Sequence, residues 1–441
     1  MAVDVLSVVV GIAVVLLGIV VSIALHEVGH MVPAKKFGVR VSEYMVGFGP
    51  TLWSRRKGET EYGVKAIPLG GYVRMVGMMP PAPAGTRPSR GFFGQVIADA
   101  RDASVSEIRP GEEPRAFYHL STPKKLVVML GGPVMNLLIA LVLTFVVLVA
   151  IGVPTVTTTV GAVSACTPTS TTAQGEPVCG ADAAPSPAAA AGLQPGDEIV
   201  VWDGEAVTSW DQLSGLIAGS PDQQVPVVVE RDGAQVPLTV TTAEREVAVV
   251  DAEGEAEVDA AGEPVTQTAG FLGVTPTQEY EPLPLSSVPA ETWRMVSGTA
   301  AIIVTLPVQV AQTAVQAFTD EERSADGVVS IVGVGRLAVD VVAADAPVVA
   351  TLQILLSLLA SLNVALFVFN LIPLLPLDGG HVVNALYEGA KRTVARLRGL
   401  PRPAPADVAR MMPVAYVMFV VLIGTGALLM IADVVDPVQL S

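Results

Sequence analysis

Four runs of apolar residues in this chain are each long enough to cross a lipid bilayer. A helix needs about 20 consecutive apolar residues to cross roughly 30 Å of hydrocarbon. The runs lie at about 5–31, 126–151, 348–373 and 412–432. Apolar residues make up 51% and charged residues 15% of the 441-residue chain, a composition that is typical of a membrane protein. We therefore predict a polytopic α-helical membrane protein with four transmembrane helices.

The positively charged residues give these runs an orientation. Segment 31–125 holds 15 of the 26 Lys and Arg and segment 382–410 holds six, whereas segment 152–345 holds five. Basic loops stay on the cytoplasmic side, so the first two segments are predicted to be cytoplasmic and the third extracytoplasmic, with both termini facing outward. The third segment carries 27 acidic against five basic residues, a net charge of −22. We interpret this charge as a solvated surface rather than a site for a basic partner.

A fifth apolar stretch, Gly298–Phe318, is interrupted by polar residues. It contains three Gln and Pro307. If it crossed the membrane, the basic segment 382–410 would face outward, against the positive-inside rule. We therefore predict an extracytoplasmic helix that lies on the protein surface or at the membrane interface.

The first apolar run ends in the motif His-Glu-Val-Gly-His at residues 26–30. Side chains four apart on a helix project from the same face, so His26 and His30 can share a metal ion while Glu27 reaches a water molecule bound to it. Alone the motif is weak evidence, because it also occurs by chance. Ionisable groups at membrane depth are costly, however, and indicate a functional site.

A catalytic zinc ion takes three protein ligands and leaves a fourth position open for water. The candidates for the third ligand are His119, His381 or a carboxylate. His119 lies in a soluble segment, where a solvated or capping role is expected. Asp378 follows an apolar run broken by Pro373 and Pro376, where the backbone can leave helical geometry and turn a carboxylate inward. We prefer Asp378, with a helix N-cap as its alternative role.

The depth of the two segments in the membrane is compatible with a shared metal. The first and third runs both pass from outside to inside, and both reach their candidate ligands after about 30 Å of helix. Their ends therefore meet the cytoplasmic side at a similar depth.

Two further motifs accompany His-Glu-Val-Gly-His. GGPVMN at 131–136 opens the second run, and NLIPLLPLDGG at 370–380 ends the third. In this order, with a domain between the second and third runs, they resemble the site-2 protease family of intramembrane zinc metalloproteases. The chain is most similar to the bacterial four-span members with an extracytoplasmic PDZ domain, and the resemblance covers most of its length.

The resemblance implies roles for individual residues. It implies that His26, His30 and Asp378 bind one Zn²⁺ ion. It also implies that Glu27 is the general base and that Asn370 contacts the substrate or the transition state. A hydrogen bond that terminates a helix is the alternative role of Asn370.

Two cytoplasmic segments carry further patterns. Residues 61–78 alternate and contain Pro68 and Gly70–Gly71, which predicts a strand pair. Directly after a membrane helix, this pair resembles the membrane-re-entrant β-hairpin of the family, whose edge could pair with an extended substrate; a self-contained cytoplasmic hairpin is the alternative. Residues 90–108 predict an amphipathic helix, either on the inner membrane surface or packed on the protein's cytoplasmic part.

The extracytoplasmic segment 188–242 resembles a mixed α/β PDZ-like domain. It predicts a helix capped by Ser209 and a hairpin that turns at Asp232–Gly233. Such a domain could bind a peptide or act as a size filter over the active site. The two cysteines, Cys166 and Cys179, are predicted to form a disulfide in an oxidising compartment, and the acidic residues 244–268 a flexible insertion.

These observations divide the chain into eight consecutive regions. The predicted regions are the first span with its motif (1–33), a cytoplasmic segment with the β-hairpin and amphipathic helix (34–125), the second span (126–151), the PDZ-like domain with its insertion (152–290), extracytoplasmic or interfacial helices (291–347), the third span with the Leu-Asp-Gly motif (348–385), a cytoplasmic loop (386–411), and the fourth span with the C-terminus (412–441).

The function expected from the motifs and the resemblance is zinc-dependent cleavage of membrane-embedded segments. The expected substrates are single-span membrane proteins, such as anti-sigma factors or remnant signal peptides, in the inner membrane of a bacterium. Membrane lipid is an expected partner and nucleic acid is not. A catalytically silent adaptor with a structural zinc is the alternative, and a zinc-gated transporter a weaker one; Glu27 favours the enzyme, because a structural zinc needs no base.

Overall fold

The computed structural model describes residues 5–82, 91–167, 170–171, 177–179, 183–249, 265–316 and 347–435. The chain divides into two compact units, Met1–Ile151 with Leu283–Ser441 and Gly152–Pro282. Most of the predicted acidic insertion, and the part of the predicted region 291–347 that follows residue 316, lie outside the described residues.

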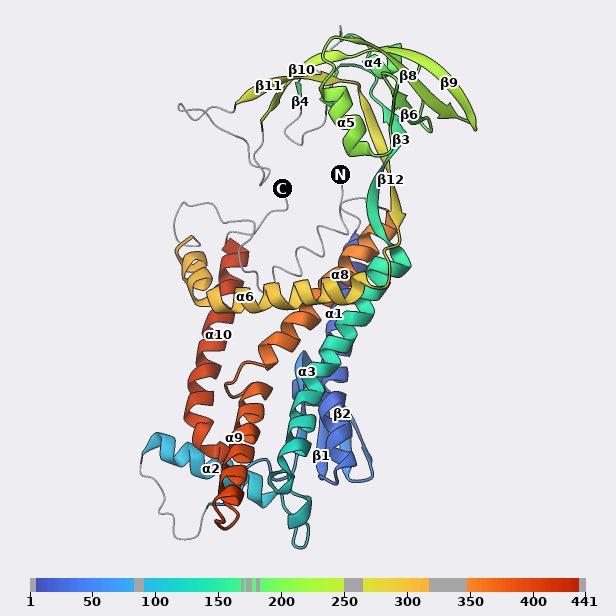
Figure 1. Cartoon of the computed structure of the whole chain (residues 1–441). Coiled ribbons are helices and arrows are strands. Elements are labelled where there is room, and N and C mark those ends of the chain that lie inside the picture. Colours follow the sequence, from blue (N-terminus) through green and yellow to red (C-terminus); the bar gives the residue numbers. More distant parts are fainter. Residues whose placement is uncertain are drawn as a thin grey trace. The chain divides into compact units, whose positions relative to one another are not determined.

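Long helices, most of them apolar, make up most of the first unit. They are α1 (Val5–Lys36), α3 (Thr122–Phe145), α6 (Ser287–Gln316), α8 (Val348–Asn370), α9 (Asp378–Leu397) and α10 (Met412–Val435). Helix α3 contacts α1, α8 and α9, and it lies beside α1 and α8 in Figure 1. Helix α3 can therefore contribute groups to a site formed with α1, α8 or α9.

Five helical segments within the described residues are long and apolar enough to cross a membrane. They are Ala13–Lys36, Thr122–Ile151, Ser287–Thr313, Val348–Asn370 and Val408–Asp433. Four overlap the predicted runs. The additional one lies in α6, where the sequence predicted a surface or interfacial helix, and in Figure 1 α6 runs across the direction of α3 and α10.

Helix α1 ends just after the two histidines, at a left-handed glycine. Gly38 has φ +85°, its N–H donates to Lys35, and the N–H of Val39 donates to the carbonyl of Ala34. This is the Schellman arrangement, in which glycine adopts the conformation that closes a helix. The chain then leaves the helix axis and enters a strand.

Two long strands, β1 (Val41–Lys57) and β2 (Thr60–Met75), form an antiparallel sheet. The prediction of strand rather than helix at 61–78 is confirmed. Residues 43–46 pair with 61–64 in the same direction and with 71–74 in the opposite direction, so the chain reverses between 64 and 71, near Pro68 and Gly70–Gly71 as predicted. The two arms pair with β1 rather than with each other, and a further reversal lies at Gly58, which has φ +65°.

Two segments that the sequence predicts to be cytoplasmic contain helices. Residues 90–108 contain α2 (Phe92–Ser106), whose Phe92 ring packs on that of Tyr416 in α10 with centroids 5.8 Å apart; the helix therefore packs on its own chain. In the predicted loop 386–411, α9 continues to Leu397 and a short 3₁₀ turn lies at Val408–Met411, so the irregular part is 398–407.

The second unit is a small α/β fold. Its main sheet has the order β12 (Val274–Glu281), β3 (Val153–Val163), β6 (Glu198–Trp202), β8 (Gln224–Arg231) and β9 (Ala234–Thr241), with β7 (Glu205–Ala206) beside β6. Helices α4 (Pro187–Ala190) and α5 (Trp210–Ala218) belong to the same unit, as do the strand pairs β4–β5 (Ser170–Thr171, Pro177–Val178) and β10–β11 (Ala243–Ala248, Thr266–Phe271).

Local predictions for this unit are confirmed. The hydroxyl of Ser209 accepts the N–H of Gln212 at the start of α5. Asp232 and Gly233, with φ of 51° and 77°, form the turn between β8 and β9, as the left-handed conformation of a two-residue hairpin loop requires. Cys166 and Cys179 form the predicted disulfide. The core of the unit is built around Trp202, which is fully buried.

Candidate metal centre

Helix α1 brings two imidazoles together by its own geometry. His26 and His30 lie one turn apart, with ring centroids separated by 4.9 Å. Their Nε2 atoms are 3.2 Å apart, and both side chains are largely shielded from solvent. The predicted shared face of the helix is therefore present.

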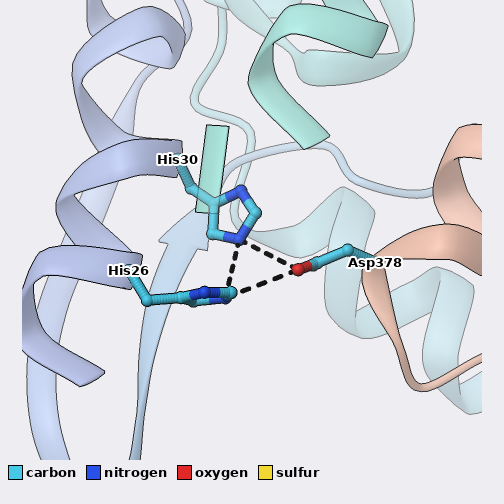
Figure 2. Close-up of side chains that lie close together, drawn as sticks. All are labelled: His26, His30 and Asp378. Carbon is cyan, nitrogen blue, oxygen red and sulfur yellow. Dashed lines mark hydrogen bonds and ion pairs between the residues drawn. The ribbon is translucent and has the colours of Figure 1, made fainter. Parts of the chain in front are cut away.

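A carboxylate from another helix completes the group. Asp378 is the first residue of α9, and Pro373 and Pro376 lie in the non-helical stretch that separates α8 from α9. Its Oδ2 lies 3.4 Å from Nε2 of His26 and 3.3 Å from Nε2 of His30, as Figure 2 shows. These three side chains form a potential metal-binding group within the described part of the chain.

Hydrogen bonding orients one of the imidazoles for metal binding. Nδ1 of His30 donates to the carbonyl oxygen of Val128 in α3 over 2.8 Å. Because that nitrogen carries the proton, Nε2 of the neutral ring presents a lone pair to the centre of the group. A backbone carbonyl as partner of the distal nitrogen is the usual arrangement for a metal-ligating histidine.

The donor set fits a zinc ion. Two imidazole nitrogens and one carboxylate oxygen are typical zinc ligands, and three protein ligands leave a position for water. Oδ2 of Asp378 is buried and has no hydrogen-bonding partner within the described residues. Lone pairs that converge without a proton between them repel one another, so a cation at their centre would relieve this repulsion.

The glycines of the GGPVMN motif create the space for these rings. A Cβ on Gly132 would lie 2.2 Å from Nε2 of His30 and 2.7 Å from that of His26. Any other residue would therefore displace the imidazoles. The sequence showed this motif but predicted no role for Gly132 or for the Val128 carbonyl. A Gly-Gly pair inside an apolar helix was the only sequence feature that pointed to close packing there.

Glu27 lies beside the convergent group without belonging to it. Its side chain is half-buried and faces β2, where a Cβ on Gly71 would lie 3.1 Å from its Cγ. The backbone of Val73 hydrogen-bonds to its carboxylate. The strand therefore holds this carboxylate next to the site.

The remaining predicted candidates lie outside the group. Nδ2 of Asn370 donates to the carbonyl of Leu366 in its own helix over 2.9 Å, which is the bond expected of its structural alternative. His381 lies one turn beyond Asp378 in α9, and the ring of His119 packs against that of Tyr118 in a tilted arrangement with centroids 4.4 Å apart. Neither histidine is among the three convergent side chains.

Together these features define a class of protein. Two imidazoles on one helix, a carboxylate from a second helix and an adjacent glutamate, in a chain with several long apolar helices, are the arrangement expected of a metal-dependent hydrolase.

Comparison with known proteins identifies the family. The model of "Peptidase family M50" matches residues 14–401. Zinc metalloprotease Rip1 of Mycobacterium tuberculosis (strain ATCC 25618 / H37Rv) is 33% identical over 446 residues, 98% of this chain and 98% of that protein. Metalloprotease MmpA of Caulobacter vibrioides is 31% identical over 393 residues, 84% of this chain and 85% of that protein. The chain belongs to peptidase family M50, the site-2 protease family, and membership makes it a zinc metallopeptidase. The resemblance of its motifs to this family is confirmed.

Proposed function

We propose that the chain is an intramembrane endopeptidase that cleaves the transmembrane segments of single-span membrane proteins. His26, His30 and Asp378 are its zinc ligands and Glu27 its general base. The observation that carries this proposal is the convergence of two Nε2 atoms from α1 and one Oδ2 atom from α9, within 3.4 Å of one another.

The chemistry divides between the metal and the side chains. A bound zinc ion makes water more acidic and polarises the scissile carbonyl. Glu27 accepts a proton from the attacking water and returns it to the leaving amine. Asn370 donates its Nδ2–H to the developing oxyanion, which requires exchange of its bond to Leu366; one such donor is typically worth about 3 kcal/mol.

We propose four spans, with both termini outside the cytoplasm and α6 at the membrane interface. The distribution of Lys and Arg supports this topology, since the two basic segments lie on one side only if α6 does not cross. The direction of α6 in Figure 1, across that of α3 and α10, agrees with an interfacial helix. The membrane is the inner membrane of a bacterium.

The β1–β2 hairpin is proposed to re-enter the membrane and bind an unwound substrate along a strand edge. Its outer part exposes large apolar side chains, namely Phe48, Leu52, Trp53 and Ile67. An apolar surface of this kind is unfavourable in water and compatible with lipid. Strand β2 contains Gly71 and Val73, which lie beside Glu27. A substrate strand bound along this part of β2 would pass close to the general base.

The substrates are proposed to be anti-sigma-factor-like proteins or remnant signal peptides. The Gly152–Pro282 unit is proposed to be a PDZ-like domain that binds a peptide end or excludes bulky substrates. Its antiparallel sheet with the helix α5 supports this reading. A silent adaptor with a structural zinc is the competing function, but it leaves the position of Glu27 beside the ligands without purpose.

The test compares the wild-type chain with Glu27→Gln in liposomes. We expect both proteins to bind about one zinc ion, and only the wild type to cleave a panel of single-span substrates. A wild type that binds zinc but cleaves no substrate would favour the adaptor. Absence of zinc from both proteins would refute the proposed ligand set.

A further inference from the structure

Asn136 in α3 is buried without a hydrogen-bonding partner. Its side chain is fully inaccessible to solvent, and neither Nδ2 nor Oδ1 has a partner within the described residues. Burial of an amide without hydrogen bonds is energetically unfavourable, because its bonds to water are lost without replacement. An unsatisfied polar group of this kind in an apolar helix calls for an explanation.

Other amides in the apolar helices have partners for their Nδ2 groups. Nδ2 of Asn363, also fully buried, donates to the hydroxyl of Ser22 over 2.9 Å and to the carbonyl of Leu359 over 2.8 Å. Nδ2 of Asn370 donates to Leu366. Asn136 therefore differs from both in the same environment.

The position of Asn136 on α3 directs it toward the metal centre. It follows Gly132 by four residues, so the two lie on the same face of the helix. Helical side chains lean toward the N-terminus and cover the preceding turn, which here is the bare surface of Gly132. That surface is the one against which the imidazoles of His26 and His30 lie.

A matching unsatisfied group lies on α1. Nδ1 of His26 is buried and has no partner in the described part of the chain. Because Nε2 of His26 faces Asp378, Nδ1 is the nitrogen that carries the proton in a ligand state. The structure thus leaves a buried donor on α1 and a buried acceptor on α3, on helix faces that meet at Gly132.

Helix α3 already serves the other histidine in this way. The carbonyl of Val128 accepts the proton of His30 Nδ1, and residues 128, 132 and 136 follow one another at intervals of one turn along the same face. Since α1 and α3 are antiparallel neighbours (Figure 1), His26 lies toward the Asn136 end of this face.

We propose that Asn136 is a positioning residue of the metal centre, whose Oδ1 accepts the Nδ1–H of His26 in the zinc-loaded state. The bond is absent from the described structure, so it forms when zinc draws His26 into ligand geometry, directly or through one buried water molecule. It fixes the tautomer and orientation of the ring. This inference rests on the proposed function, because it takes His26 as a zinc ligand.

The test measures zinc affinity by chelator competition, and the thermal midpoint of the zinc-free protein. Asn136→Leu keeps the volume but removes the acceptor, so we expect zinc affinity to fall about 10–100-fold. The midpoint of the zinc-free protein should not fall, because an apolar group replaces an unsatisfied polar one. Asn136→Asp keeps an acceptor and should retain zinc affinity within a few-fold of the wild type.

Asn363→Leu is the matched control at a buried amide with partners. It should lower the thermal midpoint while leaving zinc affinity nearly unchanged. Wild-type zinc affinity in Asn136→Leu, or equal losses in the Leu and Asp variants, would overturn the inference. If Asn136→Leu does not fold, Asn136→Ala replaces it in the comparison with Asn136→Asp. A wild type that does not bind zinc would instead refute the proposed function.

Discussion

Gly29 and Gly131 face each other across α1 and α3 at backbone contact distance. A Cβ on Gly29 would lie 2.2 Å from the carbonyl oxygen of Gly131, and a Cβ on Gly131 would lie 2.0 Å from that of Gly29. Small residues allow membrane helices to approach this closely. The residues that follow them, His30 and Gly132, form part of the candidate metal centre. The glycine contact therefore sets the distance between α1 and α3 at this centre.

Substitution of Gly131 by Ala should separate the helices and weaken the metal centre. The obstructing atoms belong to the backbone of α1, which cannot move without displacing His30. We expect a loss of about 1–3 kcal/mol of stability from overpacking, together with reduced zinc affinity. Thermal unfolding and zinc titration measure these effects. Gly424→Ala, at a position in α10 with open space around it, is the control and should be close to neutral; equal effects in both variants would contradict the prediction.

Glu388 should stabilise the first unit through a buried ionic network. It is almost fully buried, its Oε2 lies 2.9 Å from Nζ of Lys125, and it also pairs with Arg392 and accepts the N–H of Ala406. Glu388→Gln leaves buried cations without a counter-charge, so we expect a loss of about 3–5 kcal/mol in thermal or denaturant unfolding.

The control for this network is an ion pair at the surface. Arg294, which pairs with Glu291, is 76% exposed, and exposed pairs contribute about 0–1 kcal/mol. Glu291→Gln should therefore leave unfolding nearly unchanged. If it destabilises the protein as much as Glu388→Gln does, burial is not the source of the effect.

Acid should weaken the Gly152–Pro282 unit through Asp197. This buried carboxylate is held by the guanidinium of Arg231, with Oδ1 2.6 Å from its Nε, and by the N–H of Gln194. Arg231 lowers the pKa of Asp197 below its ordinary value. A lowered folded-state pKa means that the stabilisation is complete above the ordinary aspartate pKa of about 3.9 and is lost as the pH falls through and below it.

Hydrogen exchange of the β6 amides in the full chain, corrected for intrinsic rates, measures this effect. Protection in the wild type should fall as the pH drops below about 4. Asp197→Asn removes the charge that pairs with Arg231, so the β6 amides of the variant should be less protected at neutral pH. Because Asn does not titrate, the variant should also lack the part of the pH dependence of protection that comes from Asp197. Identical pH profiles for the two proteins would contradict the assignment to Asp197.

Removal of zinc should destabilise the wild-type chain by mass action. A ligand that binds only the folded state, at a free concentration 100 times its Kd, stabilises that state by about 2.7 kcal/mol. A chelator should therefore lower the thermal midpoint of the wild type. Asp378→Asn, which weakens the proposed ligand set, should respond much less, and an equal response would place the zinc elsewhere.

The sheet of β1 and β2 shows what the sequence could and could not predict. Pro68 and Gly70–Gly71 are typical of a turn, and the chain reverses near them, between 64 and 71. The two arms pair with residues 43–46 of β1 rather than with each other. Turn propensity is a local property, whereas strand pairing depends on a partner that alternation within 61–78 does not reveal.

The sequence alone determined that the chain is built on apolar helices and that His26 and His30 share a face, because these properties depend on composition and on spacing within one helix. It also indicated Asp378, because two prolines free the preceding backbone. Only the tertiary structure decided that Gly132 and the Val128 carbonyl lie on the face of α3 that meets the histidines. Those relationships depend on how closely α1 and α3 approach, and that distance is set by the contact of Gly29 with Gly131, which no pattern within either helix encodes.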